Sequence, residues 1–294
     1  MKTPKGTLIA IGGNEQKRFK KTDERFQPDF GEGFILQDII NNSEVSEPRI
    51  EVITSASEIP MIVGEKYKES FLRLGVDNVG ILDIRDRDEA DKSSILDRIG
   101  SSDIILFSGG DQRKLSRILK DTLAHQLLCE RYHNEEFTIA GTSAGAVVMS
   151  EEMISGGRNG TIIRKNDLKM GKGLGLISEI IFDSHFIKRQ RFGRLSEAAA
   201  LHPDKLGVGL GEDTAVIVRE GNILEIIGSG IVVIFDGSNL IYNQYEKLRN
   251  RIPISLANLT VHILATQDRY NIREKVAEIH YDTRHHKSEV KESG

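Results

Sequence analysis

"FTIAGTSAGAVVMS", residues 137–150, joins a predicted strand to a predicted helix through a turn made almost entirely of small residues. Gly141, Ser143 and Gly145 within this stretch fit the pattern G-x-S-x-G. Between a strand and a helix, the pattern is typical of a nucleophile elbow, a sharp turn that holds a serine hydroxyl out at the strand end. The same residues also fit a tight turn whose serine caps the helix. Ser143 is therefore a candidate nucleophile that still needs a base and an oxyanion hole.

Strand-like and helix-like segments alternate through the first half of the chain. This alternation predicts a parallel sheet with helices on both faces. The predicted fold class is therefore α/β, a doubly wound, mostly parallel sheet flanked by helices. Such sheets bind ligands at the carboxyl ends of their strands. Three predicted strand ends carry glycine and polar residues, namely IGGNE (residues 11–15), FSGGDQ (107–112) and IAGTSAG (139–145).

The length of 294 residues suits one large α/β domain or two small ones. Short strand-like segments dominate residues 205–273, but the sequence has no clear linker and no convincing repeat. We therefore predict a single domain over residues 1–275. Residues 276–294 close with DTRHHKSEVKESG, a polar stretch typical of a disordered tail.

Composition narrows the possible function classes. Hydrophobic residues make up 38% and charged residues 29% of the chain, as in ordinary globular proteins. The net charge of -4 gives no support to nucleic acid as a partner. The N-terminal sequence does not read as a signal peptide, and no segment is long and apolar enough for a membrane span. We expect a cytoplasmic protein with no membrane partner.

The sequence gives no sign of a metal or another cofactor. Its histidines, cysteine and acidic residues match none of the usual metal-site spacings. IGGNEQK lacks both the full G-x-G-x-x-G pattern and the lysine of a Walker motif. The single cysteine, Cys129, excludes an internal disulfide. We expect no metal and no cofactor, so the chemistry is assigned to side chains and backbone.

The second glycine-containing strand end supplies a candidate oxyanion hole. Gly109 and Gly110 close a predicted strand, so a free N–H such as that of Gly110 is expected beside the elbow. The N–H of Ala144, at the start of the predicted helix, is a second donor. Two such donors stabilise the negative charge of a tetrahedral intermediate. An ordinary turn between strand and helix is the alternative for this glycine pair.

His185 is the most distinctive of the eight histidines as a candidate base. It lies in IFDSHFIKRQRFGR, at the end of an apolar strand and ahead of a basic segment. Glu212 and Asp213 follow another glycine-containing strand end, and either carboxylate is a candidate to orient the histidine. The cations of residues 188–194 suit the binding of carboxylates, although a solvated helix surface is the common alternative.

Four motifs resemble the cyanophycinase family of serine peptidases, namely GGDQ, GTSAGA, DSHFIKRQRFGRL and GLGEDTA. GTLIAIGGNEQK and SLANLTVHILATQDRYNI also resemble the family's first strand and last segment, so the resemblance covers nearly the whole chain. The family shares its fold with the aspartyl dipeptidases and the class I glutamine amidotransferases. The resemblance therefore implies a class I glutamine amidotransferase-like fold with a nucleophile elbow, and it suggests a homodimer.

The resemblance implies a catalytic triad of Ser143, His185 and Glu212, and an oxyanion hole at Gly110 and Ala144. It implies hydrolysis of cyanophycin, a polyaspartate with an arginine on each side-chain carboxyl, to β-aspartyl-arginine dipeptides. The positions that correspond to the family's substrate pocket are Gln112, Asp183, Ser184, Arg189, Arg191 and Arg194.

The chain departs from the family pattern at two positions. The family often has glutamine where this chain has Ser184, and it commonly has aspartate where this chain has Gly211. Neither departure changes the triad. Ser184 keeps open a second substrate class, the short aspartyl or isoaspartyl peptides that a related dipeptidase would cleave. A non-catalytic binding protein on the same fold is the remaining alternative.

Overall fold

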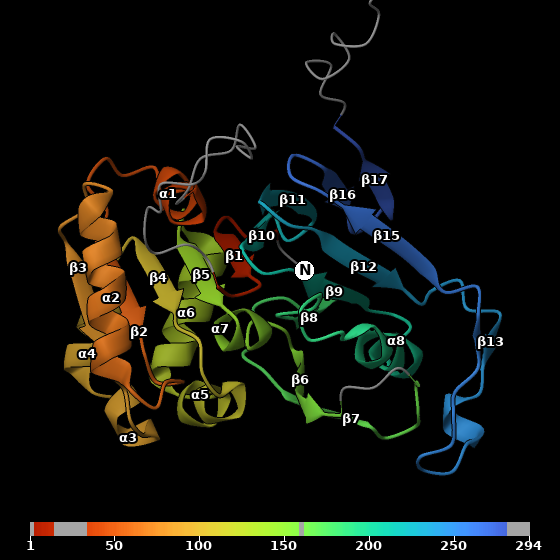
Figure 1. Cartoon of the computed structure of the whole chain (residues 1–294). Coiled ribbons are helices and arrows are strands. Elements are labelled where there is room, and N and C mark those ends of the chain that lie inside the picture. Colours follow the sequence, from red (N-terminus) through yellow and green to blue (C-terminus); the bar gives the residue numbers. More distant parts are fainter. Residues whose placement is uncertain (1–2, 15–33, 159–161, 281–294) are drawn as a thin grey trace, which may run out of the picture.

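The computed structural model describes residues 3–14, 34–158 and 162–280. Its main sheet has a parallel half made of β1 (Thr7–Ile11), β5 (Thr138–Thr142), β4 (Ile104–Phe107), β2 (Ile50–Ile53) and β3 (Val79–Leu82). The antiparallel half is made of β10 (Thr214–Arg219), β11 (Ile223–Gly228), β16 (Arg269–Asn271) and β17 (Val276–Glu278). The strand order is β17-β16-β11-β10-β1-β5-β4-β2-β3, so the two halves meet at β1 (Figure 1).

Helices cover both faces of the parallel half. One face carries α1 (Phe34–Asn41) and α2 (Pro60–Arg73), which pack on strand residues such as Ile9 and Val52. The other face carries α3 (Arg87–Ala90), α4 (Ser93–Gly100), α5 (Gln112–Leu119) and α6 (Leu123–Asn134), which share a core with Leu8 and Ile105. Successive strand residues point to opposite faces, so strands covered on both sides are mostly apolar. Glu51 in β2 is an exception, buried and paired with Arg98. The predicted doubly wound α/β class is confirmed.

A smaller sheet stands beside the main one (Figure 1). Its strands lie in the order β15-β12-β9-β8, with bounds β15 (Thr260–Leu264), β12 (Val232–Asp236), β9 (Leu206–Leu210) and β8 (Ile180–Asp183). Phe182 and Ile234 on its inner face join the core of the main sheet, and Phe235 on its outer face packs under α8 (Phe192–Leu201). β8 and β9 are parallel, so they end at the same edge. The sequence predicted short strands in this part of the chain but not a separate sheet.

Two small hairpins complete the described part of the chain. One is formed by β6 (Glu152–Gly157) and β7 (Leu168–Lys172), and the other by β13 (Tyr242–Asn243) and β14 (Leu256–Ala257). The short helix η2 (Tyr245–Lys247) lies between β13 and β14 in the chain. The predicted start of the tail at residue 276 is wrong, because β17 pairs with β16 and its backbone completes a ladder of the main sheet. The rest of that predicted tail, residues 281–294, lies outside the described residues.

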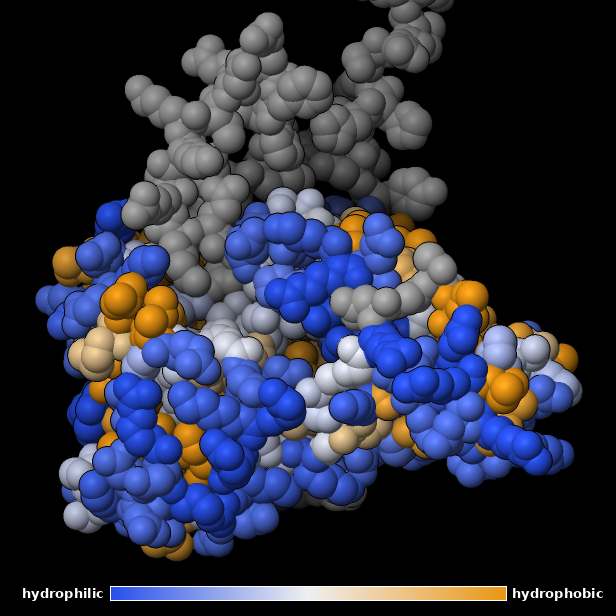
Figure 2. Space-filling model, turned by 60° about the horizontal axis from the view of Figure 1, so that its bottom comes forward, coloured by the Kyte–Doolittle hydropathy of each residue, from blue (hydrophilic) through white to orange (hydrophobic). Residues whose placement is uncertain are grey.

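The surface agrees with the sequence composition. Figure 2 shows hydrophilic residues over most of one face, with hydrophobic residues in small, separate groups. Within the described ranges, no helix is both long enough and apolar enough to cross a membrane.

We predict that Asp38 lowers stability near neutral pH. Burial of this α1 side chain, together with the nearby Glu225 carboxylate, raises the pKa of Asp38 from 3.8 to about 6. The protonated form therefore favours the folded state, and this advantage is lost as the pH rises through about 6. Asp38→Asn, which mimics the protonated form, is expected to raise the free energy of unfolding at pH 7.5 by about 1–2 kcal/mol, allowing for partial exposure.

Urea unfolding at pH 7.5 and at pH 4 checks this expectation, with Asp97→Asn on an exposed helix position as the control. At pH 4 the gain from Asp38→Asn should become small. An equal gain at both pH values would show that the effect comes from helix propensity and not from ionisation.

Candidate active site

Ser143 occupies a sharp turn between β5 and the short helix α7 (Ala144–Val147). Its backbone has φ 52° and ψ −107°, and its N–H donates to the Ile11 carbonyl at 2.9 Å. A Cβ on Gly141 would lie 2.4 Å from the Gly145 carbonyl oxygen, and a Cβ on Gly145 would lie 2.4 Å from that of Phe107. The small residues around the serine are therefore required because three backbone segments pack against one another at the elbow.

His185 and Glu212 come from the neighbouring ends of β8 and β9. His185 Nδ1 lies 2.8 Å from Glu212 Oε1, with both side chains mostly buried. A carboxylate only accepts, so Nδ1 carries the hydrogen and Nε2 is the nitrogen left to accept a proton. The structure therefore brings together the predicted base and the predicted orienting carboxylate.

The second oxygen of Glu212 has two further partners. Asn14 Nδ2 and Lys188 Nζ each lie 3.3 Å from Glu212 Oε2. Burial alone would raise the pKa of Glu212, but hydrogen bonds from His185 and Lys188, and the charges of both, hold it below its usual value. The carboxylate is thus kept ionised. IGGNE and the basic run were both candidate ligand sites in the sequence, but no pattern there indicated that Asn14 or Lys188 contacts Glu212.

The end of β1 lies against the segments of all three triad candidates. The Gly12 carbonyl accepts the His185 N–H at 2.8 Å, and the Gly13 carbonyl accepts the Asp213 N–H at 3.0 Å. Gly13 has φ 103°, and a Cβ there would lie 2.5 Å from His185 Cε1. The imidazole ring therefore packs directly on the Gly13 backbone, in a space that only glycine leaves open.

The Ser143 hydroxyl is not joined to the histidine in this structure. Its Oγ lies 3.5 Å from Ser184 Oγ, and the described residues include no hydrogen bond between Ser143 and His185. Catalytic hydrogen bonds in ligand-free enzymes are often formed only when substrate binds. To complete the triad, the Ser143 hydroxyl would have to turn from Ser184 toward His185.

The two predicted oxyanion donors lie beside the elbow and are unused. Gly110 has φ 147° and is held in its turn because Asp111 N–H donates to the Ala56 carbonyl at 3.0 Å. A Cβ on the preceding Gly109 would lie 3.6 Å from Ser143 Cβ, so this loop borders the serine. Within the described ranges, neither the Gly110 N–H nor the Ala144 N–H has an acceptor. Their role as an oxyanion hole stays a prediction.

Three of the predicted substrate-binding residues form a buried ion cluster. Asp183 is fully buried, and its carboxylate oxygens accept from Arg191 Nη1 at 2.8 Å and from Arg194 Nε and Nη2 at 3.1 and 2.9 Å. Arg191 Nη1 also donates to the Ser184 carbonyl at 2.5 Å. One carboxylate faces two guanidinium groups, so the cluster carries a net positive charge next to Ser184. These side chains hold one another, and within the described part of the chain Arg191 Nε is the atom of the cluster that is buried without a partner.

The other three predicted substrate-binding residues have different surroundings. Ser184 is 4% exposed and contacts the Ser143 hydroxyl. Arg189 is exposed, and its guanidinium has no partner among the described residues. Gln112, at the start of α5, donates from Nε2 to the Ile154 carbonyl at 3.0 Å and so holds β6. Arg189 is therefore the cation of this group that is free to meet a ligand.

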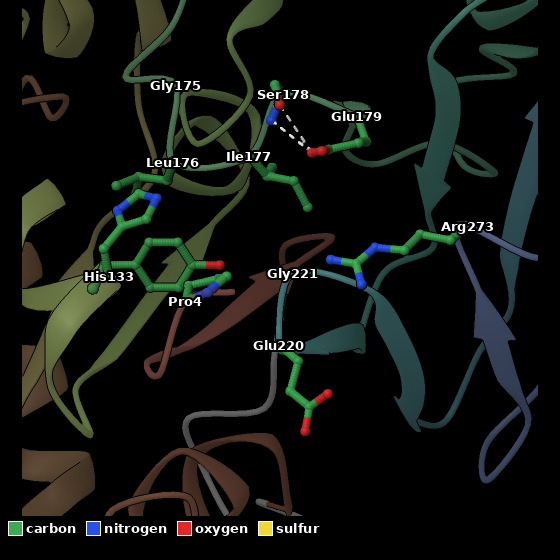
Figure 3. A pocket seen from close by; sticks show the side chains of 11 residues that line it. Pro4, His133, Gly175, Leu176, Ile177, Ser178, Glu179, Glu220, Gly221 and Arg273 are labelled. Carbon is green, nitrogen blue, oxygen red and sulfur yellow. Dashed lines mark hydrogen bonds between the residues drawn. The ribbon is translucent and has the colours of Figure 1, made fainter. Parts of the chain in front are cut away.

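A cavity of about 100 Å³ lies beyond the amino ends of the parallel strands of the main sheet (Figure 3). It lies where β1 begins, and its lining includes Pro4, His133, Ser178, Glu220 and Arg273. The triad candidates lie beyond the opposite ends of the parallel strands, and none of the predicted site residues lines this cavity. It is therefore separate from the candidate active site.

Comparisons with known proteins give matches over most of the chain. The sequence model of Peptidase family S51 matches residues 28–226. The chain is 35% identical over 278 residues to a curated cyanophycinase from Trichormus variabilis, with 94% of this chain and 89% of that protein covered. It is 35% identical over 267 residues to a curated cyanophycinase from Geminocystis herdmanii, with 91% and 94% covered. The crystal structure of a peptidase from an acI-B1 Actinobacterium has a TM-score of 0.62 at 19% identity, with 92% and 98% covered, which is a likeness of fold.

We predict that Gly13→Ala displaces the His185 ring and strongly slows the chemistry at Ser143. A new Cβ would lie 2.5 Å from Cε1, so the ring must move. Displacement of a catalytic group by about 1 Å can cost about 100-fold in rate. The measurement is the rate at which a small fluorophosphonate labels Ser143.

Gly100→Ala is the matched control, because a Cβ there meets nothing within 4 Å. It should label at the rate of the unmodified protein. Equal labelling of Gly13→Ala and Gly100→Ala would contradict the position assigned to the ring.

Proposed function

The chain belongs to peptidase family S51, and from this premise we propose that it is a serine exopeptidase that hydrolyses cyanophycin to β-aspartyl-arginine dipeptides. The observation that carries the proposal is the 35% identity to curated cyanophycinases over 94% of the chain. Two contacts support it: His185 is paired with Glu212, and the Ser143 hydroxyl lies against Ser184, the residue before His185. A serine peptidase needs a nucleophile, a base and an orienting carboxylate together.

We assign the nucleophile to Ser143, the general base to His185 and the orienting role to Glu212. The Ser143 hydroxyl turns to His185 Nε2, gives up its proton and attacks the carbonyl carbon of the peptide bond. His185 then passes that proton to the leaving nitrogen, and water hydrolyses the acyl-enzyme with the same histidine as base. Glu212 holds Nδ1–H at 2.8 Å and stabilises the charged imidazole.

The oxyanion that forms during the attack is assigned to the N–H groups of Gly110 and Ala144. Both donors are without an acceptor in the described part of the chain, and both adjoin the elbow. Fixed donors aimed at a developing charge need no reorganisation during the reaction, and the loss of one typically costs about 10²–10³ in rate.

The charges around the site suit a substrate that carries free carboxylates. The Asp183 cluster holds one more positive than negative charge, and Arg189 adds an exposed guanidinium that has no partner among the described residues. Each arginine of cyanophycin carries a free carboxylate, which guanidinium groups bind by paired hydrogen bonds. We assign Arg189 to direct contact with substrate, and Asp183, Arg191 and Arg194 to shaping the pocket and its charge.

We further propose that the enzyme is a cytoplasmic homodimer with no nucleic-acid partner. The family resemblance supports the dimer, and the net charge of -4 argues against a polyanion as partner. Sedimentation velocity measures the state of association directly.

We predict that Ser143→Ala abolishes the release of dipeptides from cyanophycin while leaving the fold intact. Without a nucleophile the rate should fall by about 10⁴-fold or more, since triad members act as a unit. Purified wild type and variant are each incubated with insoluble cyanophycin and, separately, with isoaspartyl dipeptides, and products are read by mass spectrometry.

Release of β-aspartyl-arginine by wild type alone supports both the nucleophile and the substrate. Cleavage of the small peptides without attack on the polymer would contradict the substrate and favour the dipeptidase alternative. A wild type that cleaves neither would contradict peptidase function and favour a binding protein.

We predict that Arg189→Met raises KM for cyanophycin about tenfold with little change in kcat, because a charge-assisted hydrogen bond to a substrate carboxylate is lost. Arg249→Met, also exposed, is the control. Thermal unfolding should be unchanged in both variants, since neither guanidinium has a partner in the described structure. An unchanged KM would remove Arg189 from the substrate site.

A further inference from the structure

Ser184 is the partner of the Ser143 hydroxyl in the ligand-free protein. The two Oγ atoms lie 3.5 Å apart, and Ser184 is only 4% exposed. Neither hydroxyl has another hydrogen-bond partner among the described residues. The nucleophile therefore rests against a second hydroxyl and not against its base.

The backbone on both sides of this contact is firmly held. Ser143 N–H is bonded to Ile11 and His185 N–H to Gly12, at 2.9 and 2.8 Å. The Ser184 carbonyl accepts from Arg191, whose guanidinium also holds the buried Asp183. The segments cannot separate easily, so the freedom that remains is rotation of the serine side chains between staggered positions.

Activation of Ser143 has a consequence for Ser184. When the Ser143 hydroxyl turns to His185, the Ser184 hydroxyl is left buried and without a partner. A buried hydroxyl without a hydrogen bond is unfavourable, so the free protein favours the resting contact. An oxygen acceptor on a bound substrate, placed near the scissile bond, would give Ser184 a new partner and remove this penalty.

We propose that Ser184 couples substrate binding to engagement of the nucleophile. In the free enzyme its hydroxyl holds Ser143 away from His185. When substrate binds, Ser184 donates to a carboxylate or carbonyl oxygen of that substrate, and Ser143 donates to His185 Nε2. The inference rests on the proposed function, because it takes Ser143 as the nucleophile and His185 as its base.

Ser184→Ala tests the proposal through two rates that should move in opposite directions. The first is labelling by a small fluorophosphonate, in which Ser143 Oγ bonds to phosphorus, fluoride leaves and the serine proton passes to His185. The probe is too small to form a hydrogen bond with Ser184, so it does not release Ser143 from the resting contact in wild type. Ser184→Ala removes that contact, and the labelling rate should therefore rise about fivefold. The second is kcat/KM for cyanophycin, which should fall about tenfold because the contact between Ser184 and substrate is lost.

Ser184→Thr keeps a hydroxyl and should return both rates toward those of wild type. Ser155→Ala is the control, because its hydroxyl bonds only to the backbone of β7. Thermal unfolding shows whether each variant is folded. If Ser184→Ala does not fold, Ser184→Thr is compared with wild type instead. Because Ser184→Thr keeps the hydroxyl, the proposal requires its labelling to be as slow as that of wild type.

Two results would overturn the role of Ser184. They are a fall of both rates by the same factor in Ser184→Ala, as expected of a purely structural residue, and no change in either rate. A wild type that neither labels nor cleaves would instead contradict the proposed function itself, and with it the inference.

Discussion

The end of β1 is the constraint on which the candidate site depends. The carbonyl oxygens of Ile11, Gly12 and Gly13 accept the N–H groups of Ser143, His185 and Asp213. These N–H groups belong to segments that are far apart in the chain and that follow strands of two different sheets. One strand end therefore sets the relative positions of the candidate nucleophile, base and carboxylate through backbone hydrogen bonds.

This arrangement requires close approach and unusual backbone conformations. A Cβ on Gly12 would lie 1.8 Å from the Gly211 carbonyl oxygen, so the two sheets meet there through backbone alone. Ser143, His185 and Asp213 all have positive φ, a region that L-residues other than glycine seldom adopt. Such conformations persist where the surroundings hold them, and here the hydrogen bonds to β1 and the shared core beneath both sheets do so.

Sequence reasoning could reach those features that depend on neighbouring residues. The alternation of strands and helices predicted the doubly wound sheet, and G-x-S-x-G between a strand and a helix placed Ser143. The second sheet was not predicted, because its paired strands are far apart in the sequence and no local pattern indicates which strands pair. The contact of Asn14 with Glu212 was missed for the same reason. Two cations of the same run have different surroundings: Arg189 is exposed, whereas Arg191 is buried and pairs with Asp183. No local sequence pattern distinguishes the two.

Because β1 holds the segments of the candidate triad through main-chain carbonyls, their placement does not depend on the identity of exposed side chains nearby. Every amino acid supplies the same carbonyl, so exposed side chains such as those of Ile187 and Arg189 can change while these backbone hydrogen bonds persist. We expect substitutions at such positions to change ligand contacts while the backbone at Ser143 and His185 stays in place. That tolerance ends at Gly12 and Gly13, where any added carbon meets the backbone of β9's turn or the imidazole ring.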